Sequence, residues 1–449
     1  MQIHSDEPAE TDGLQRQHLV VEIATIAATA TPPLVLGVHG DWGSGKTSFM
    51  KHVRKELDGK HTKNVVTVWF EAWRYQNEPA PVVALLQEMR QAFSKWKKLD
   101  GRIKKLGEIT IRTLLNSLND LAKLVQLESL PFSAEKIQLL GEQWERENLE
   151  SRLVVDSLQD SLQEAIKTLL PDSKDPSPRV VIFIDDLDRC NPEMAYRLLE
   201  GLKIYLNLNN CVFVLAMNQQ IVIKAIASVM KKEDDDARVR LEAEAYLEKL
   251  CANIWRLPPP KLSHQYFTAL LDTTQNTPIQ AITDAAETSR PFLPPNPRRL
   301  KALANLYNRL WLRAMNTATI ILDHSGQPTL ALRILVVAYV YQFHSEFYQR
   351  WRHDPTFLEE LRRWMQTGKP KLIQNKEGKD IPDPAFFALI LPSFAKTDDG
   401  SPTPGATTIT SNYPDPSAPG VFWIAPLLQG PLADDGPENY RDLLNLEQA

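Results

Sequence analysis

One segment predicts the architecture around it: Val35-Leu36-Gly37-Val38-His39-Gly40-Asp41-Trp42-Gly43-Ser44-Gly45-Lys46-Thr47. An apolar run with strand character leads into the pattern Gly-x-x-x-x-Gly-Lys-Thr, and an amphipathic helix follows, with apolar residues Phe49, Met50, Val53 and Leu57. Glycines in such a loop let successive backbone N–H groups point at phosphate oxygens, and the helix presents its positive end to the same anion. A chance match in a glycine-rich loop would lack this context, so we predict a strand, a phosphate-binding loop and a helix in succession.

The loop residues predict a site for a nucleoside triphosphate. We expect contacts with the phosphates from a continuous run of residues: Gly40, Asp41, Trp42, Gly43, Ser44, Gly45, Lys46, Thr47 and Ser48. Lys46 should reach the β- and γ-phosphates and stabilise their charge during the reaction. The Thr47 hydroxyl should bind Mg²⁺.

A second buried strand, over residues 180–184, ends in two carboxylates. Phosphoryl transfer needs a positioned metal ion, a positioned water and stabilisation of the charge on the γ-phosphate. We expect Asp185 to hold Mg²⁺ together with Thr47, and Asp186 to polarise the attacking water as a catalytic residue. The alternative is that Asp185, Asp186 and Asp188 only cap the turn after the strand.

Asn218 follows a third apolar strand, over residues 211–217. It either contacts the γ-phosphate or the attacking water, as sensor residues do, or serves as a plain turn residue. Four cations could stabilise the developing charge, although each could equally be a surface charge or part of a helix ion pair: Arg189, Lys249, Arg298 and Arg299. An arginine finger is worth roughly 10³ to 10⁵ in rate, so its identity separates a fast ATPase from a slow switch.

The composition is that of an ordinary globular protein. The chain has 449 residues, enough for two or three domains, and a formal net charge of −5, which argues against a surface built throughout to bind nucleic acid. Three cysteines are too few for a disulfide framework, and residues 1–13 contain no apolar signal segment. Residues 330–341 are apolar but contain Arg333, which predicts a buried helix. We therefore expect a cytoplasmic protein without membrane contact.

Strands alternate with helical patterns up to residue 260, which predicts an α/β fold with a parallel sheet covered by helices on both faces. We divide the chain into an NTPase core over 1–260 with a helical insertion at about 81–169, a helical lid over 261–316, a mostly helical region over 317–394 and an irregular Pro/Gly-rich tail over 395–449. No strand is expected beyond Lys261.

Helix limits can also be predicted at several places. The first helix should cover residues 14–29, and one apolar helix should cover about 330–347. Asn296 followed by Pro297 predicts the start of the lid helix. Trp351 and Trp364, which lie among arginines, predict either a contact surface or ordinary helix packing.

Three motifs together resemble the KAP family of P-loop NTPases: the phosphate-binding loop, Phe70-Glu71-Ala72-Trp73-Arg74-Tyr75, and Ile184-Asp185-Asp186-Leu187-Asp188-Arg189-Cys190. Tyr246-Leu247-Glu248-Lys249 and Asn296-Pro297-Arg298-Arg299 fit the same pattern, and the resemblance runs over about residues 12–308. It implies binding of ATP and Mg²⁺, ATP hydrolysis, a five-stranded parallel core of the additional-strand type found near AAA and signal-transducing ATPases, a helical lid and homo-oligomers. It also implies Lys249, or an arginine of a neighbouring subunit, as the finger, and Arg298 or Arg299 as the lid residue that senses the nucleotide.

The chain departs from the family pattern in two places. Many members carry transmembrane helices where this chain has residues 81–169, which contain no apolar span. Glu71 stands where the family often has Asn, and it adds a carboxylate near the expected water site.

Three functions compete on this basis. The leading hypothesis is a conformational switch that binds and hydrolyses ATP in a bacterial antiphage-defence or signalling assembly. The second is an ATP-bound scaffold with slow turnover that recruits an effector or sensor protein. The third, a nucleic-acid-stimulated ATPase, rests on the basic residues 95–105 with Trp96, for which a solvated helix face is the simpler account.

Overall fold

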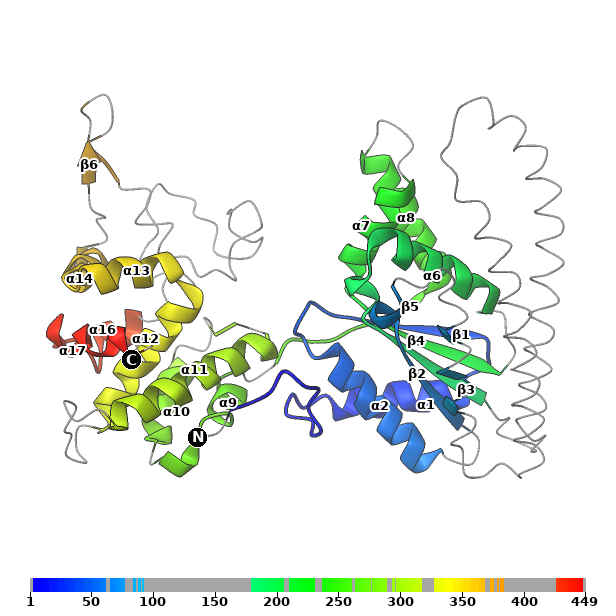
Figure 1. Cartoon of the computed structure of the whole chain (residues 1–449), viewed down its shortest axis with the longest axis horizontal. Coiled ribbons are helices and arrows are strands. Elements are labelled where there is room, and N and C mark those ends of the chain that lie inside the picture. The colour runs from blue at the N-terminus through cyan, green and yellow to red at the C-terminus, as the bar shows by residue number, and fades with distance from the viewer. Residues whose placement is uncertain are drawn as a thin grey trace. The chain divides into compact units, whose positions relative to one another are not determined.

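The computed structural model of the chain describes residues 3–61, 65–76, 84–85, 88–89, 91–92, 179–205, 210–230, 236–260, 263–275, 277–288, 293–294, 296–316, 327–367, 372–374, 378, 380–382 and 425–446. The chain forms two compact units (Figure 1), one of Pro8–Pro258 and one of Met1–Glu7 with Pro259–Ala449. Most of the predicted insertion, including the basic residues 95–105, lies outside the described residues.

The Pro8–Pro258 unit is built on a parallel sheet with the strand order β2-β3-β4-β1-β5. The strands are β1 (Leu34–His39), β2 (Val65–Glu71), β3 (Arg179–Asp185), β4 (Cys211–Met217) and β5 (Asn253–Arg256). Because all strands run the same way, the ends of β1, β3 and β4 meet at one edge of the sheet, next to the phosphate-binding loop, the acidic pair and Asn218. β4 separates β1 from β3, so the predicted additional-strand core is confirmed.

Helices cover both faces of this sheet, as the sequence predicted (Figure 1). Side chains on β4 alternate between the two hydrophobic cores: Val212 and Val214 face α1 (Gln17–Thr29) and α2 (Lys46–Lys60). Phe213 and Leu215 face the core that includes α6 (Pro192–Tyr205), α7 (Gln219–Met230) and α8 (Asp236–Leu250). Apolar residues on both sides of a strand are what a sheet buried between two helical layers requires.

The first helix begins later than the sequence predicted. It was expected from residue 14, but α1 starts at Gln17. Gln15 has a φ of 56°, a left-handed conformation that interrupts a right-handed helix. Two short 3-10 helices follow two of the strands: η1 (Ala72–Tyr75) comes directly after β2, and η2 (Leu187–Arg189) comes one residue after β3.

The second unit is helical and has one continuous hydrophobic core. Its helices are α9 (Ser263–Thr268), α10 (Ile279–Thr288), α11 (Pro297–Asn316), α12 (Gln327–Phe343), α13 (Ser345–His353), α14 (Phe357–Thr367), α16 (Ala425–Gln429) and α17 (Glu438–Arg441), with 3-10 turns η3 (Thr273–Gln275) and η6 (Leu443–Asn445). The predicted cap of α11 is confirmed, because Asn296 Oδ1 accepts hydrogen bonds from the backbone N–H groups of Arg298 and Arg299.

Three expectations for this region were wrong. The single helix over 330–347 is divided at His344, whose backbone leaves the helical conformation between α12 and α13. Strands do occur beyond Lys261, since β6 (Leu372–Gln374) and β7 (Asp380–Pro382) form an antiparallel pair. Residues 425–446 of the expected irregular tail contain short helices, and side chains of this segment, including Leu428, Leu432 and Tyr440, are buried in the core of this unit.

The open question about the two tryptophans is answered by burial. The side chains of Trp351 and Trp364 are both 1% exposed and belong to the core, so ordinary packing is the correct interpretation. Helix α12 is likewise buried along most of its length. Among the described residues, no helix combines the length and the apolar character that crossing a membrane would require.

The segment 425–446 is held by a buried ion pair. Asp435 accepts two hydrogen bonds from Arg333 on α12, at 2.8 and 2.5 Å, and one from the Tyr440 hydroxyl at 2.9 Å. We expect Asp435→Asn to lower the free energy of unfolding by about 3 kcal/mol, because it leaves a mostly buried guanidinium without its counter-charge. Urea unfolding checks this against Asp434→Asn, an exposed neighbour. Equal midpoints for the two variants would contradict the role of the pair.

Candidate nucleotide-binding site

The phosphate-binding loop has a backbone that favours glycine at two positions and is crowded at a third. Gly43 and Gly45 have φ values of 81° and 90°. A Cβ on Gly40 would lie 2.4 Å from Ser44 Oγ, so a side chain there would force the Ser44 hydroxyl to turn away. The loop is therefore folded into the tight form that brings backbone amides around an anion.

The start of α2 fits a phosphate group. Gly45 precedes the helix and supplies no side-chain cap, so the first N–H groups of α2 have no partner within the helix and carry its positive dipole. Ser44 Oγ is buried and, within the described part of the chain, has no hydrogen-bond partner. A buried hydroxyl and a set of uncapped amides at one place are the donors that phosphate oxygens need.

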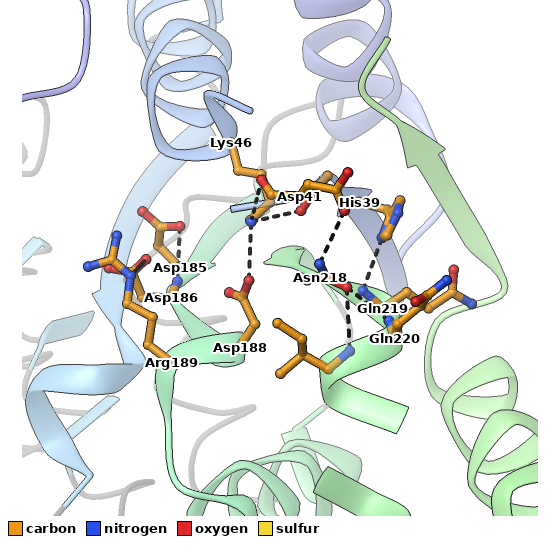
Figure 2. Close-up of polar contacts among 12 residues, drawn as sticks. His39, Asp41, Lys46, Asp185, Asp186, Asp188, Arg189, Asn218, Gln219 and Gln220 are labelled. Atoms are coloured by element: carbon orange, nitrogen blue, oxygen red, sulfur yellow. Dashed lines mark hydrogen bonds and ion pairs between the residues drawn. The ribbon is translucent and has the colours of Figure 1, made fainter. Parts of the chain in front are cut away.

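Lys46 lies at the centre of the site (Figure 2). Its ammonium donates to the carbonyls of Gly40 and Asp41, at 2.8 and 3.4 Å, and pairs with Asp188 Oδ2 at 3.1 Å. The sequence had offered only turn capping for Asp188. The structure places it on η2 as the counter-charge of Lys46.

Asp185 and Thr47 lie close enough to share one ligand. Asp185 ends β3 and is 1% exposed, and its carboxylate accepts hydrogen bonds from the Thr47 hydroxyl and, at 2.9 Å, from the Asp186 backbone N–H. Burial, together with the charge of Asp186, raises the pKa of Asp185 to about 6, although the Thr47 bond works against this shift. A hydroxyl and a carboxylate are the oxygen ligands that suit Mg²⁺.

Magnesium at this place would need further oxygen ligands from phosphate and water. Among the described residues, no cluster of three or more His, Cys, Asp or Glu side chains could hold a metal ion alone. A P-loop metal site takes one hydroxyl and one carboxylate from the protein, so the donor set fits a metal that arrives with a nucleotide.

Asp186 adopts a conformation unlike that of its neighbour. Its φ is 58°, in the left-handed region that Asp and Asn tolerate best, and its carboxylate pairs with Arg189 Nε at 2.8 Å. Burial raises the pKa of Asp186, and the charge of Glu71 adds to this shift. Glu71 lies opposite Asp185 in the β2–β3 register and pairs with Arg74.

Asn218 is a turn residue that also faces the phosphate-binding loop, and its contact with the γ-phosphate or the attacking water stays a prediction. Its Oδ1 accepts hydrogen bonds from the backbone N–H groups of Gln220 and Ile221, and so caps α7. Its Nδ2 donates to Asp41 Oδ1 at 3.3 Å, toward the phosphate-binding loop (Figure 2). The side chain is therefore a turn residue and also faces the loop.

The contacts described above do not include the other predicted residues. Trp42 is 65% exposed. Lys249 lies on an exposed position near the end of α8. Arg298 and Arg299 belong to the other unit, where Arg298 Nε pairs with Asp6 Oδ1 at 3.3 Å and burial lowers the pKa of Arg299. Roles for Lys249 and Arg298 in catalysis stay predictions.

Two residues next to the phosphate-binding loop were not predicted from the sequence. Arg16 is buried and donates to the Ser44 carbonyl at 2.7 Å and to the Pro258 carbonyl. His39 ends β1, and its Nδ1 accepts a hydrogen bond from the Gln219 backbone N–H at 3.0 Å. A lone arginine before the first helix carries no sequence signal, whereas His39 could have been found from its place directly before Gly40.

His39 makes the site sensitive to acid. Burial, together with the charge of Arg256, lowers the pKa of His39, so the unfolded chain takes up this proton at a higher pH than the folded chain. The free energy of unfolding should therefore fall as the pH drops below about 6.5, the ordinary pKa of histidine. We expect His39→Asn, which keeps an acceptor but does not titrate, to remove about 1 kcal/mol of the stability difference between pH 7.5 and pH 5.5 in urea unfolding. The same pH dependence in both chains would contradict this.

The sheet order and the loop define a P-loop NTPase. Residues 17–310 match the model of the KAP family P-loop domain, and the chain belongs to this family. Over 242 residues it is 23% identical to the phage T7 exclusion protein of Escherichia coli strain K12, an alignment that covers 51% of this chain and 30% of that protein. The chain thus spans less than a third of that relative. Among solved structures it is similar to the ORC2 protein of Aeropyrum pernix in its ADPNP–ADP complexes, at 13% identity and a TM-score of 0.36, covering 83% of this chain and 80% of that one.

Proposed function

We propose that this chain is a conformational switch that binds ATP with Mg²⁺ and hydrolyses it. The observation that carries the proposal is the convergence of Lys46, Thr47 and Asp185 at one edge of the sheet, where β1 and β3 end. These residues come from two segments more than a hundred positions apart in the sequence. Their meeting is what a metal-bound triphosphate needs, and turn capping alone does not require it.

Each residue has a role that follows from its surroundings. The amides at the start of α2 and the Lys46 ammonium hold the phosphates, and Thr47 with Asp185 holds the metal. Bound Mg²⁺ would neutralise charge on the phosphate oxygens. Asp186 polarises the attacking water as a general base, and its raised pKa brings it nearer the pH at which such a base works best. Asn218 couples the conformation of the loop to α7, since it contacts Asp41 and caps that helix.

We further propose that the switch acts in a bacterial antiphage-defence or signalling assembly, as a homo-oligomer that engages an effector or sensor protein. The name of the phage T7 exclusion protein supports the defence role, at low identity and over part of that relative. Exposed Lys249 is the candidate for a finger that reaches a neighbouring subunit, and Arg298 for the lid residue that senses the nucleotide. A reducing, cytoplasmic compartment fits the three free thiols of Cys190, Cys211 and Cys251.

A specific observation favours slow turnover, and with it the scaffold alternative. Arg189 pairs with one oxygen of Asp186, and although burial raises the pKa of this carboxylate, the cation lowers it, which makes the carboxylate a weaker base toward water. The two functions share the binding site and differ in the fate of the bound ATP.

Steady-state phosphate release tests the proposal. We expect release from ATP that depends on Mg²⁺, and an assembly in mass photometry that grows or shrinks with a non-hydrolysable ATP analogue. Binding of the analogue without phosphate release would favour the scaffold. Failure to bind nucleotide at all would refute both.

A further inference from the structure

The Lys46 ammonium has no donor left for a phosphate. An ammonium group has three N–H bonds, and the Gly40 carbonyl, the Asp41 carbonyl and Asp188 Oδ2 account for all three. The ion pair is shielded from water, since the Lys46 and Asp188 side chains are only 7% and 5% exposed. A phosphate that reaches Lys46 must therefore displace one of these partners.

Of the three partners of Lys46, Asp188 is the one that a phosphate would displace. The two carbonyls belong to the phosphate-binding loop and are fixed by the backbone that also carries the glycines. Asp188 belongs to another element, η2, and is joined to Lys46 by its side chain alone. Asp188 is also an anion, so it and a phosphate would repel each other if both lay beside Lys46, where little water screens their charges.

We propose that Asp188 occupies the place at Lys46 that the terminal phosphates of a nucleotide take, so that nucleotide binding is an exchange of one anion for another. This inference rests on the proposed function, and it adds a residue that tunes the affinity of the site for nucleotide. Before a nucleotide binds, the ion pair with Asp188 keeps the buried lysine charged and satisfied. The cost of breaking it weakens the binding of any ligand whose phosphates reach Lys46.

Displacement of Asp188 would also affect Asp186, the proposed general base. Asp188 lies two positions from Asp186 and next to Arg189, which pairs with Asp186. Leu187, between them, is fully buried and fixes the turn in the core. Release of Asp188 from Lys46 therefore changes a side-chain contact of the anchored turn that also follows Asp186, so that phosphate arrival and water activation are coupled.

Asp188→Asn tests the exchange, because asparagine keeps a hydrogen-bond acceptor for Lys46 and removes the charge. The matched control is Glu193→Gln, which removes one exposed carboxylate at the start of α6, a few residues away. Calorimetry measures the dissociation constants of MgATP, MgADP and AMP for the unmodified chain and both variants. We expect Asp188→Asn to bind MgATP and MgADP about tenfold more tightly, a change of about 1.4 kcal/mol. AMP affinity should stay the same, because its single phosphate does not extend to Lys46, and Glu193→Gln should behave as the unmodified chain.

Other results would overturn the inference. Equal or weaker MgATP binding by a folded Asp188→Asn chain would mean that Asp188 does not compete with the phosphates. An equal gain in Glu193→Gln, or for AMP, would assign the effect to overall charge. If Asp188→Asn does not fold, Asp188→Ser keeps an acceptor in a smaller side chain and must show the same gain. Absence of nucleotide binding in all of these chains would refute the proposed function as well, whereas unchanged affinity in a chain that binds MgATP refutes the exchange alone.

Discussion

Replacing Lys46 with alanine should weaken MgATP binding by on the order of 100-fold or more. The bound phosphates would lose the cation that pairs with them, and loss of one partner of a buried, hydrogen-bonded charge pair costs about 2–5 kcal/mol. Lys46 is the one side-chain cation of the loop, and its ammonium lies between loop carbonyls and the acidic turn. Calorimetric titration with MgATP gives the dissociation constants.

This variant needs a companion, since Lys46→Ala also leaves the Asp188 carboxylate buried without its counter-charge. The double variant Lys46→Ala/Asp188→Asn removes both charges and should regain stability in thermal unfolding. It should still fail to bind MgATP. Binding by the double variant near the affinity of the unmodified chain would show that Lys46 is not a phosphate ligand.

Replacing Asp186 with asparagine should lower steady-state phosphate release by about 10²- to 10⁴-fold, the range that a positioned general base contributes. Asparagine is the appropriate substitution because the φ of 58° penalises alanine, whereas Asn accepts this conformation readily. MgATP affinity should change little, since Asp186 is expected to act on water rather than on the phosphates.

The contrast between binding and turnover is the informative result for Asp186. Glu193→Gln, with the same loss of charge on an exposed position, serves as the control and should release phosphate at the rate of the unmodified chain. Phosphate release by Asp186→Asn equal to that of the control would remove Asp186 from the reaction and leave the slow scaffold as the better account.

The sequence predicted those features of the fold that depend on local pattern. Buried strands without alternation, such as residues 211–217, indicated a covered parallel sheet, and the glycines of the loop indicated a backbone that the φ values of Gly43 and Gly45 confirm. Asn296 and Pro297 marked the start of α11 correctly because capping is a contact between neighbours in sequence.

Features that depend on distant contacts could not be predicted in the same way. Asp188 reads as a turn residue until the fold brings η2 against Lys46, 142 positions earlier in the chain. Residues 425–446 follow a segment rich in proline and glycine, and the helices within them become evident only with the buried Asp435–Arg333 pair and their leucines in the core. Arg16 acts through backbone carbonyls, which leave no trace in the sequence.

Titration of the unmodified chain with ATP, in Mg²⁺ and again in excess EDTA, tests most directly whether the loop and the acidic strand end form one metal–nucleotide site. The account predicts binding of one ATP per chain in Mg²⁺ and a clear loss of affinity, on the order of tenfold or more, when the ion that joins Thr47 and Asp185 to the phosphates is removed. No heat of binding in Mg²⁺, or the same affinity in EDTA, would contradict it.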